Sequence, residues 1–371
     1  MRRRLSSFVC ELTSLDPVNE KSTRQALDSP AGFEERLVHA LQPARFFVLA
    51  HALHAFMQLG LLSDIAERPA TIDELAARFG LDRERLAGLL QYLANEGIVD
   101  LLDSGRVGLT DEGAGFAEFW PWYSLLVGGY SRTFGSLAIT LRSGAPYAER
   151  DGLQVGIGSG GISQYDALPM TRNLLAQVGD WQTIVDIGCG DGSYLIDLCA
   201  LLPNARGVGV EPNPDSRATA EALARERQLE GRVSFLDGDA MAMPDLTHLD
   251  GPLCFLTAFV LQEVLEQEGR EAVINLLRSN FTAHPDAHWI VIEVDECADD
   301  TEVMAHPLAL AYYNPYYLIH KVTEQRLEKV AFWEALFDEA GVRVCAMDRP
   351  DPRIDSLGLK VGFLLRRVPN P

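Results

Sequence analysis

The sequence predicts an α/β chain built from a mostly helical N-terminal domain and a doubly wound, largely parallel sheet that ends in an antiparallel hairpin. From Trp181 onward, apolar strand-like segments alternate with helix-like segments, which is typical of a parallel sheet covered on both faces. A glycine-rich loop follows the first of these strands and opens a helix. The last two strands have no helix between them, so we expect them to pair directly at one edge of the sheet.

The alternating region supplies seven expected strands and the helices between them. The helices are expected over 193–203, 215–228, 267–281 and 322–341. The strands are expected over 183–188, 206–212, 233–239, 253–260, 288–296, 342–348 and 359–367.

Length and charge limit the class of protein. The 371 residues are enough for about two domains, and 47 % hydrophobic residues are typical of a globular chain. The 32 basic and 53 acidic residues give a net charge of −21, which argues against nucleic acid or an anionic membrane as a partner. The six cysteines are dispersed, and the basic N-terminus lacks the apolar core of a signal peptide. A cytoplasmic location is therefore expected.

The N-terminal region predicts a helical dimerisation domain. Residues 44–66 are apolar nearly all round, so this helix should be buried inside the domain or against a second subunit, as in a homodimer. His51 and His54 on it are expected to pack, with metal binding as the alternative. Residues 70–113 follow a helix, turn, helix, hairpin order, which is the outline of a winged helix. The divisions expected are an arm over 1–30, this domain over 31–150 and a catalytic domain over 151–371.

The segment VDIGCGDGSY carries the most specific pattern. Gly188, Gly190 and Gly192 allow a tight turn and close approach to a ligand after the first strand, where Asp186 can bind a cationic amino group. Glu211 ends the second strand and can accept both hydroxyls of a ribose. At the end of the third strand, Asp239 can accept from an adenine amino group, and Met241 can pack on the ring.

These three segments, VDIGCGDGSY, GVGVEP and LDGDAM, resemble the S-adenosylmethionine (SAM) signatures of class I methyltransferases. The resemblance implies a Rossmann-like fold with a terminal antiparallel hairpin, SAM as cofactor, and a role for Ala240 and Thr257 in the same site. The N-terminal region resembles the dimerisation domain of small-molecule O-methyltransferases. A small-molecule acceptor is therefore expected.

The residues after the fourth strand depart from a simple O-methyltransferase. No histidine occurs between His248 and His284, and Gln262 and Glu263 stand where a histidine base is usual. Some members of the α-keto acid C-methyltransferases, a group that this chain resembles in its two-domain plan, hold a metal here through a histidine and a carboxylate, with a second histidine later in the chain. Glu263 fits that carboxylate, but glutamine is a poor ligand, so a divalent metal stays open. The catalytic candidates are Glu263, Gln262, His306 and His320.

Five segments resemble the α-keto acid C-methyltransferases that act on 2-ketoarginine (5-guanidino-2-oxopentanoate) or 2-oxoglutarate. They are residues 119–134, 163–172, 259–267, 311–320 and 351–360. The resemblance implies methylation at C3 of a keto acid in the biosynthesis of a β-methylated amino acid, as in antibiotic pathways. A guanidinium acceptor would need carboxylates such as Glu263, Glu293 and Asp295, whereas 2-oxoglutarate would need bases such as Arg172 and Lys321. The acids at the ends of the fourth and fifth strands favour 5-guanidino-2-oxopentanoate. Another keto acid, or O-methylation of a small natural product, is the alternative. The expected acceptor-binding residues are Gln164, Tyr165, Arg172, Gln262, Glu263, Tyr312, Tyr313, Asn314, Tyr316 and Tyr317.

Overall fold

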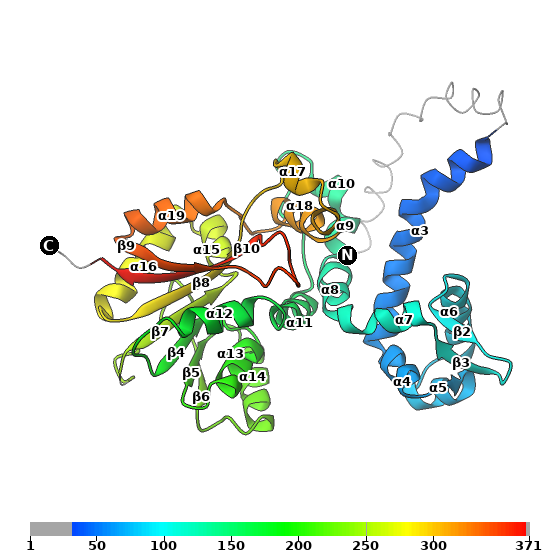
Figure 1. The fold of residues 1–371 in the computed structure, drawn as a ribbon, viewed down its shortest axis with the longest axis horizontal. Coiled ribbons are helices and arrows are strands. Elements are labelled where there is room, and N and C mark those ends of the chain that lie inside the picture. Colours follow the sequence, from blue (N-terminus) through cyan, green and yellow to red (C-terminus); the bar gives the residue numbers. More distant parts are fainter. Residues whose placement is uncertain (1–31, 250, 369–371) are drawn as a thin grey trace, which may run out of the picture.

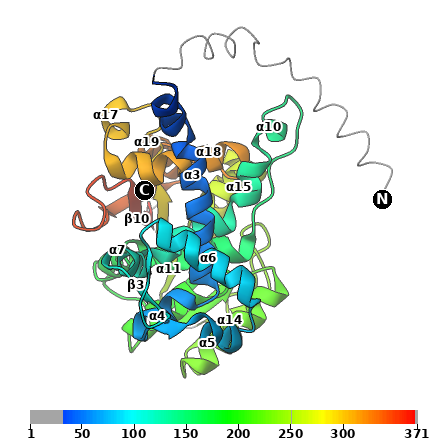
Figure 2. The same ribbon diagram turned by 90° about the vertical axis from the view of Figure 1, so that its right-hand side faces the viewer.

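The computed structural model describes residues 32–249 and 251–368, which form an N-terminal helical lobe and a larger α/β lobe (Figure 1). The arm expected over 1–30 lies outside these residues. The N-terminal lobe faces the viewer in Figure 2. Its elements are α3 (Phe33–Gln58), α4 (Leu61–Glu67), β1 (Ala70–Thr71), α5 (Ile72–Phe79), α6 (Arg83–Asn95), β2 (Val99–Leu101) and β3 (Arg106–Leu109).

The helices and hairpin of this lobe occur in the predicted order. Thr71 and Glu74 form a reciprocal capping box at the start of α5, Gly80 ends that helix, and Asp82 caps α6 through the Arg85 N–H. The hairpin β2–β3 joins β1 in a small antiparallel sheet of order β1-β3-β2. Assignment of this lobe to the winged-helix class stays a prediction.

The long apolar helix expected over 44–66 is wrong as a single element. The chain breaks after α3 because Gly60 adopts a left-handed φ of 73°, and α4 continues at 68° to α3. Within the described chain, Leu53 and Phe56 are the buried residues of α3, so burial of the rest against a second subunit stays a prediction. No single helix in 32–249 or 251–368 is long and apolar enough to span a membrane, although the bent pair α3 and α4 meets the length and composition test together.

Short helices connect the two lobes. The glycine-rich segment 155–172 falls on two helices, of which the first packs on the connecting helices and the second on the main sheet. The connecting elements are α7 (Asp111–Gly115), η2 (Ala117–Phe119), α8 (Trp120–Tyr123), η3 (Ser124–Gly129), α9 (Ser131–Gly135), α10 (Leu137–Thr140), α11 (Gly152–Ser163) and α12 (Ala167–Leu175).

The α/β lobe is a seven-stranded sheet of order β6-β5-β4-β7-β8-β10-β9, with β10 antiparallel to both of its neighbours. All seven predicted strands and the terminal antiparallel hairpin are confirmed. The elements are β4 (Thr183–Ile187), α13 (Ser193–Leu201), β5 (Arg206–Val210), α14 (Pro214–Glu226), β6 (Val233–Leu236), β7 (Leu253–Ala258), α15 (Leu261–Gln267), α16 (Arg270–Ala283), β8 (His288–Val294), α17 (Thr301–Met304), η4 (Ala309–Tyr313), α18 (Asn314–Val322), α19 (Val330–Glu339), β9 (Val342–Asp348) and β10 (Lys360–Arg367).

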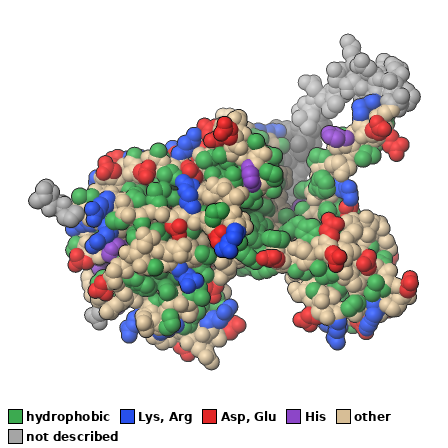
Figure 3. All heavy atoms as spheres, in the orientation of Figure 1, with side chains coloured by type: hydrophobic (Ala, Val, Ile, Leu, Met, Phe, Trp, Pro, Cys, Tyr) green, Lys and Arg blue, Asp and Glu red, His purple; other side chains and the backbone are tan. Residues whose placement is uncertain are grey.

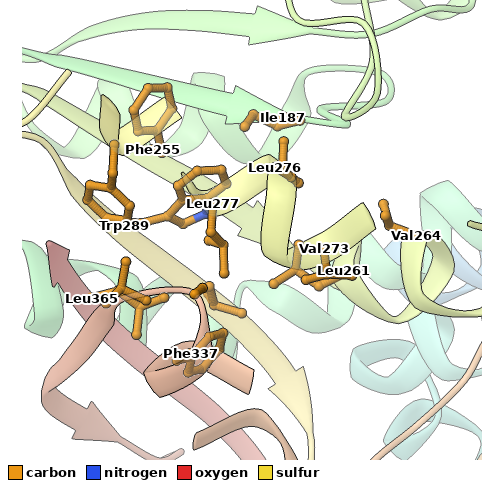
Figure 4. Close-up of a cluster of buried hydrophobic side chains, with 14 of the residues drawn as sticks. Ile187, Phe255, Leu261, Val264, Val273, Leu276, Leu277, Trp289, Phe337 and Leu365 are labelled. Atoms are coloured by element: carbon orange, nitrogen blue, oxygen red, sulfur yellow. The ribbon is translucent and has the colours of Figure 1, made fainter. Parts of the chain in front are cut away.

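Helices cover both faces of this sheet. On one face α15, α16 and α19 bury Leu261, Leu277 and Phe337 against strand residues such as Trp289 (Figure 4). On the other face α12, α13 and α14 pack on the same strands. The strands are buried on both sides, which agrees with their continuous apolar sequences. The loops at the carboxyl ends of β4, β5, β6 and β7 are thereby fixed along one edge, where ligands bind in such sheets.

Candidate active site

The glycine loop after β4 is shaped for close approach of a ligand. Gly188 and Gly192 have left-handed φ values of 75° and 72°. A Cβ on Gly188 would lie 2.8 Å from Val260, and one on Gly192 would lie 2.7 Å from Phe235. Side chains are therefore excluded at both positions, and the loop presents bare backbone between β4 and α13.

Two predicted carboxylates flank this loop. Glu211 follows β5 and accepts from the Gly190 N–H at 3.1 Å and the Asn213 N–H at 3.0 Å. Asp186 lies inside β4, where burial, with a further contribution from the charge of Glu211, raises its pKa to about 8. A cationic amino group beside these acids would offset their mutual repulsion. The loop and both acids thus fit the amino acid and ribose parts of SAM.

The third predicted segment lies at the end of β6. Asp239 Oδ1 accepts the N–H groups of Met241 and Ala242, both at 2.7 Å. Ala240 packs against the core, and Met241 is 52 % exposed, so its side chain is free to cover a ring. Thr257 is placed differently from the prediction. It is fully buried in β7, and its hydroxyl accepts from the Trp289 indole at 3.1 Å, so it faces the core instead of a ligand.

A cavity of about 280 Å³ extends from the glycine loop toward α18. Phe259, which joins β7 to α15, lines it with a left-handed φ of 61°, a rare conformation for an aromatic residue and one found at functional sites. The side chains and backbone that line the cavity come from Leu125, Tyr130, Arg150, Gly152, Val155, Gly156, Ser159, Ile162, Ser163, Gly188, Gly190, Ala258, Phe259, Val260, Gln262, Glu263, Tyr312, Tyr316, His320, Gln325 and Lys360.

One side of the cavity carries an ion pair. Arg150 Nη2 donates to Glu263 Oε1 at 2.7 Å, and the same oxygen accepts from Gln325 Nε2 at 3.0 Å. The Tyr130 hydroxyl lies 3.4 Å from Gln325 Oε1 and is polarised by Arg150. Glu263 is therefore bonded through Oε1 to a cation and an amide, and it belongs to no group of acids, histidines or cysteines suited to a metal ion among the described residues.

A second ion pair lies elsewhere on the wall. Lys360 of β10 donates to Asp166, and both side chains are almost completely buried. Lys360 Nζ also lies 5.6 Å from the Tyr312 ring and 5.8 Å from the Phe259 ring. Burial alone lowers the pKa of Lys360, but Asp166 outweighs this effect and raises it, so the ammonium stays charged.

His320 is the histidine that the structure brings to the cavity. Its Nδ1 lies 2.8 Å from the Tyr316 carbonyl oxygen. A carbonyl only accepts, so Nδ1 carries the proton and Nε2 bears the lone pair. Nε2 is buried and has no hydrogen-bond partner in the described part of the chain. Burial lowers the pKa of His320 to about 4, and the charge of Arg150 adds to this, so the ring is neutral at neutral pH.

The four tyrosines divide between two faces of their helical segment. Tyr312 and Tyr316 line the cavity. Tyr313 and Tyr317 face away, since the Tyr313 hydroxyl donates to Asp355 and the Tyr317 hydroxyl donates to the Asp295 carbonyl oxygen at 2.7 Å. Asn314 is exposed to solvent.

Four other predicted residues do not line the cavity. Gln164 donates to Asp197 at 2.6 Å, and the Tyr165 hydroxyl lies 3.4 Å from the Glu118 carbonyl oxygen. Arg172 is exposed on α12. His306 accepts the Leu308 N–H at 3.2 Å outside the cavity, which removes the geometric basis for a catalytic role.

Sequence reasoning missed Arg150, Lys360, Tyr130 and Gln325. None of them belongs to a motif, and each meets its partner only through the tertiary fold. His51 and His54 pack as expected, His51 against Phe47 and His54 beside Gln154. Within 32–249 and 251–368, no three His, Cys, Asp or Glu side chains form a group suited to a metal ion.

Comparisons with a protein family, with related sequences and with solved structures all find methyltransferases. A family model for a methyltransferase domain matches residues 184–280. The 2-ketoarginine methyltransferase of Streptomyces arginensis is 45 % identical over 338 residues, covering 91 % of this chain and 97 % of that protein. The indolepyruvate C-methyltransferase of Streptomyces griseus is 29 % identical over 265 residues, covering 70 % and 78 %. The structure of human N-acetylserotonin methyltransferase in complex with SAM matches with a TM-score of 0.65 at 16 % identity, covering 91 % and 98 %, and thus shares the fold.

Proposed function

Because the chain belongs to the SAM-dependent methyltransferase family that includes 2-ketoarginine methyltransferase, we propose that it methylates C3 of an α-keto acid. The acceptor we favour is 5-guanidino-2-oxopentanoate, on the way to a β-methylated amino acid. Its relatives include enzymes named for a guanidino keto acid and for indolepyruvate, both of which are α-keto acids.

The charges around the cavity support a dipolar acceptor. Both basic side chains on its wall, Arg150 and Lys360, are already matched by an acid, Glu263 and Asp166 respectively. A dicarboxylate such as 2-oxoglutarate would bring two negative charges to this wall. Among the described residues, both basic side chains there are already paired with an acid, so neither charge would be fully neutralised. An acceptor with one guanidinium and one carboxylate adds no net charge and therefore leaves the neutral balance of this wall intact.

The observation that carries the mechanism is the lone pair of His320 Nε2 beside the Arg150 guanidinium. The ketone at C2 makes the C3 proton acidic enough for a positioned base, and Nε2 is the neutral, unpartnered nitrogen on the cavity wall. As Nε2 takes that proton, the electrons of the C3–H bond move to the C2 oxygen as an enolate. Arg150 can donate to this oxygen, since Glu263, which also accepts from Gln325, holds the guanidinium in place.

SAM, when bound, supplies an electrophilic methyl group on its sulfonium. Gly188 and Gly190 line the same cavity as His320, so the chain holds the donor loop and the acceptor wall around one space. The new C3–C bond forms as the S–C bond breaks, and the electron pair leaves with S-adenosylhomocysteine. The apolar side chains of Val260, Phe259 and Leu125 exclude water from the reacting carbon.

Two measurements test this proposal. The protein with SAM and 5-guanidino-2-oxopentanoate should yield a product that NMR identifies as methylated at C3. In D₂O, with S-adenosylhomocysteine in place of SAM, the enzyme should catalyse exchange of the C3 protons. His320→Asn should slow this exchange at least ~100-fold, and His306→Asn, outside the cavity, should leave it unchanged. O-methylated product, or exchange that His320→Asn does not affect, would refute the mechanism.

We also propose a cytoplasmic homodimer formed through α3. Apolar side chains between residues 33 and 48 of α3 are exposed, among them Val38, Phe46 and Phe47 at 55 %, 55 % and 61 %. This part of α3 stands away from the other helices (Figures 1 and 3). A second copy of the helix would cover the face and remove it from water.

A further inference from the structure

Three buried polar atoms without a hydrogen-bond partner in the described chain lie around one aromatic ring. They are Gln262 Oε1, Glu293 Oε2 and His320 Nε2. The His320 and Tyr316 rings are 4.1 Å apart, and the Tyr316 hydroxyl interacts with the Gln262 amide and with the charge of Glu293. Buried polar groups are nearly always bonded, so a cluster of this kind needs an explanation.

All three atoms can accept a hydrogen bond from a bound molecule. Gln262 Oε1 is an acceptor, and His320 Nε2 is an acceptor because Nδ1 carries the proton. Glu293 accepts through both oxygens once its carboxyl is ionised. A guanidinium has five N–H donors, no acceptor, and a flat face that stacks on a tyrosine ring. In the proposed mechanism His320 Nε2 takes the C3 proton. Gln262 Oε1 and Glu293 Oε2 therefore remain to interact with the far end of the keto acid.

Glu293 is buried behind this wall of the cavity and does not line it, and its Oε2 has no hydrogen-bond partner among the described residues. Its Oε1 accepts the Gln262 N–H at 3.3 Å, which holds the carboxyl behind the cavity-lining Gln262 and Tyr316. The nearby acid, Glu263, is bonded to Arg150 instead. Resting on the proposed function, we propose that Gln262 binds the guanidinium of the acceptor and that Glu293, buried behind Gln262, supplies the compensating negative charge, so that the pair selects a cationic keto acid.

The protonation of Glu293 agrees with this role. Burial raises its pKa to about 8, with a contribution from the neighbouring charge of Glu263, although the N–H groups of Gln262 and Leu261 oppose the effect. Glu293 is thus mostly neutral at pH 7 while no cation is near. A guanidinium stabilises the carboxylate and drives release of that proton, so binding of a cationic acceptor at pH 7 is coupled to loss of up to one proton.

The test compares two acceptors of equal length, 5-guanidino-2-oxopentanoate and the neutral 5-ureido-2-oxopentanoate. Wild-type enzyme should favour the guanidino acid in kcat/KM. Glu293→Gln should lower kcat/KM for the guanidino acid ~10- to 100-fold, mainly through KM, and change the ureido value less than ~3-fold. Glu296→Gln, an acid just beyond β8 that lines a neighbouring cavity, is the matched control and should change neither value.

Calorimetry supplies a second readout. In two buffers of different ionisation enthalpy at pH 7, wild-type protein should release a proton on binding the guanidino acid, and Glu293→Gln should release none. Unchanged SAM affinity would establish that the variant is folded. The inference would be overturned if Glu293→Gln still preferred the guanidino acid, or if it released as many protons as the wild-type protein on binding that acid. If no keto acid is methylated, the proposed function fails, and the binding measurement alone still decides the role of Glu293.

Discussion

The buried ion pair between Lys360 and Asp166 should stabilise the fold measurably. The two side chains are 4 % and 7 % exposed, and they join β10 to the N-terminus of α12 across 194 positions of sequence. Lys360→Met keeps the length of the side chain but leaves the Asp166 carboxylate buried, with the Ala167 N–H as its remaining partner. Loss of one member of a buried pair costs about 3–5 kcal/mol, so we expect a loss of that size in the free energy of unfolding.

A double-mutant cycle separates the pair from the packing around it. Urea denaturation followed by tryptophan fluorescence should show a loss of similar size for Asp166→Asn, and a smaller loss for the double variant than the sum of both. The coupling expected for residues in direct contact is about 1–3 kcal/mol. The exposed pair of Lys329 and Asp299, at 3.0 Å, is the control, and the same substitutions there should leave the midpoint unchanged. Additive losses at Lys360 and Asp166 would refute the reasoning.

Two further predictions follow from buried carboxyls and from α3. Asp186 and Glu293 each have a folded pKa of about 8. The folded protein therefore binds more protons than the unfolded chain, and stability should fall between pH 6.5 and 8 by roughly 2 kcal/mol per group. Asp186→Asn should remove about half of this slope in urea denaturation without SAM, and an unchanged slope would contradict the assignment. Light scattering should give twice the chain mass for wild type and about the chain mass for Phe47→Glu, whereas two equal masses would exclude α3 as the interface.

The strands could be predicted because each one is visible in its own short stretch of sequence. Each strand is a short apolar run between polar turns, and burial on both faces removes the need for alternation. The break of the N-terminal helix was not predicted, although its signal was present. Gly60 is the residue that takes the left-handed conformation, and a glycine inside an apolar helix is as consistent with packing as with a break.

The tyrosine segment illustrates what helical spacing adds. Tyr312 and Tyr316 are four residues apart and therefore share a face, which is the face toward the cavity. Tyr313 and Tyr317 share the adjacent face and bond to Asp355 and the Asp295 backbone. The prediction from composition placed all four tyrosines at the site. The four-residue spacing instead separates Tyr312 and Tyr316, which line the cavity, from Tyr313 and Tyr317, which bond to residues outside it.

The charged residues of the cavity could not be predicted in the same way. Arg150 and Glu263 are 113 positions apart, and Lys360 and Asp166 are 194 apart. No local pattern links such pairs, because the sheet order brings them together. Glu263 shows the consequence, since its place after β7 suggested a base or a metal ligand, and only the fold reveals the arginine that already occupies it.

The net charge of −21 therefore says little about what the cavity selects. Around it, Arg150 and Lys360 are each neutralised by an acid at contact distance, so their fields largely cancel for any acceptor. Glu293 is different, because burial keeps it neutral until a cation approaches. A neutral acceptor leaves Glu293 as a carboxylic acid and gains little, whereas a guanidinium favours the carboxylate and gains the attraction of its charge. Discrimination in such a cavity depends on one titratable group that responds to the substrate, and the many fixed surface acids contribute little to it.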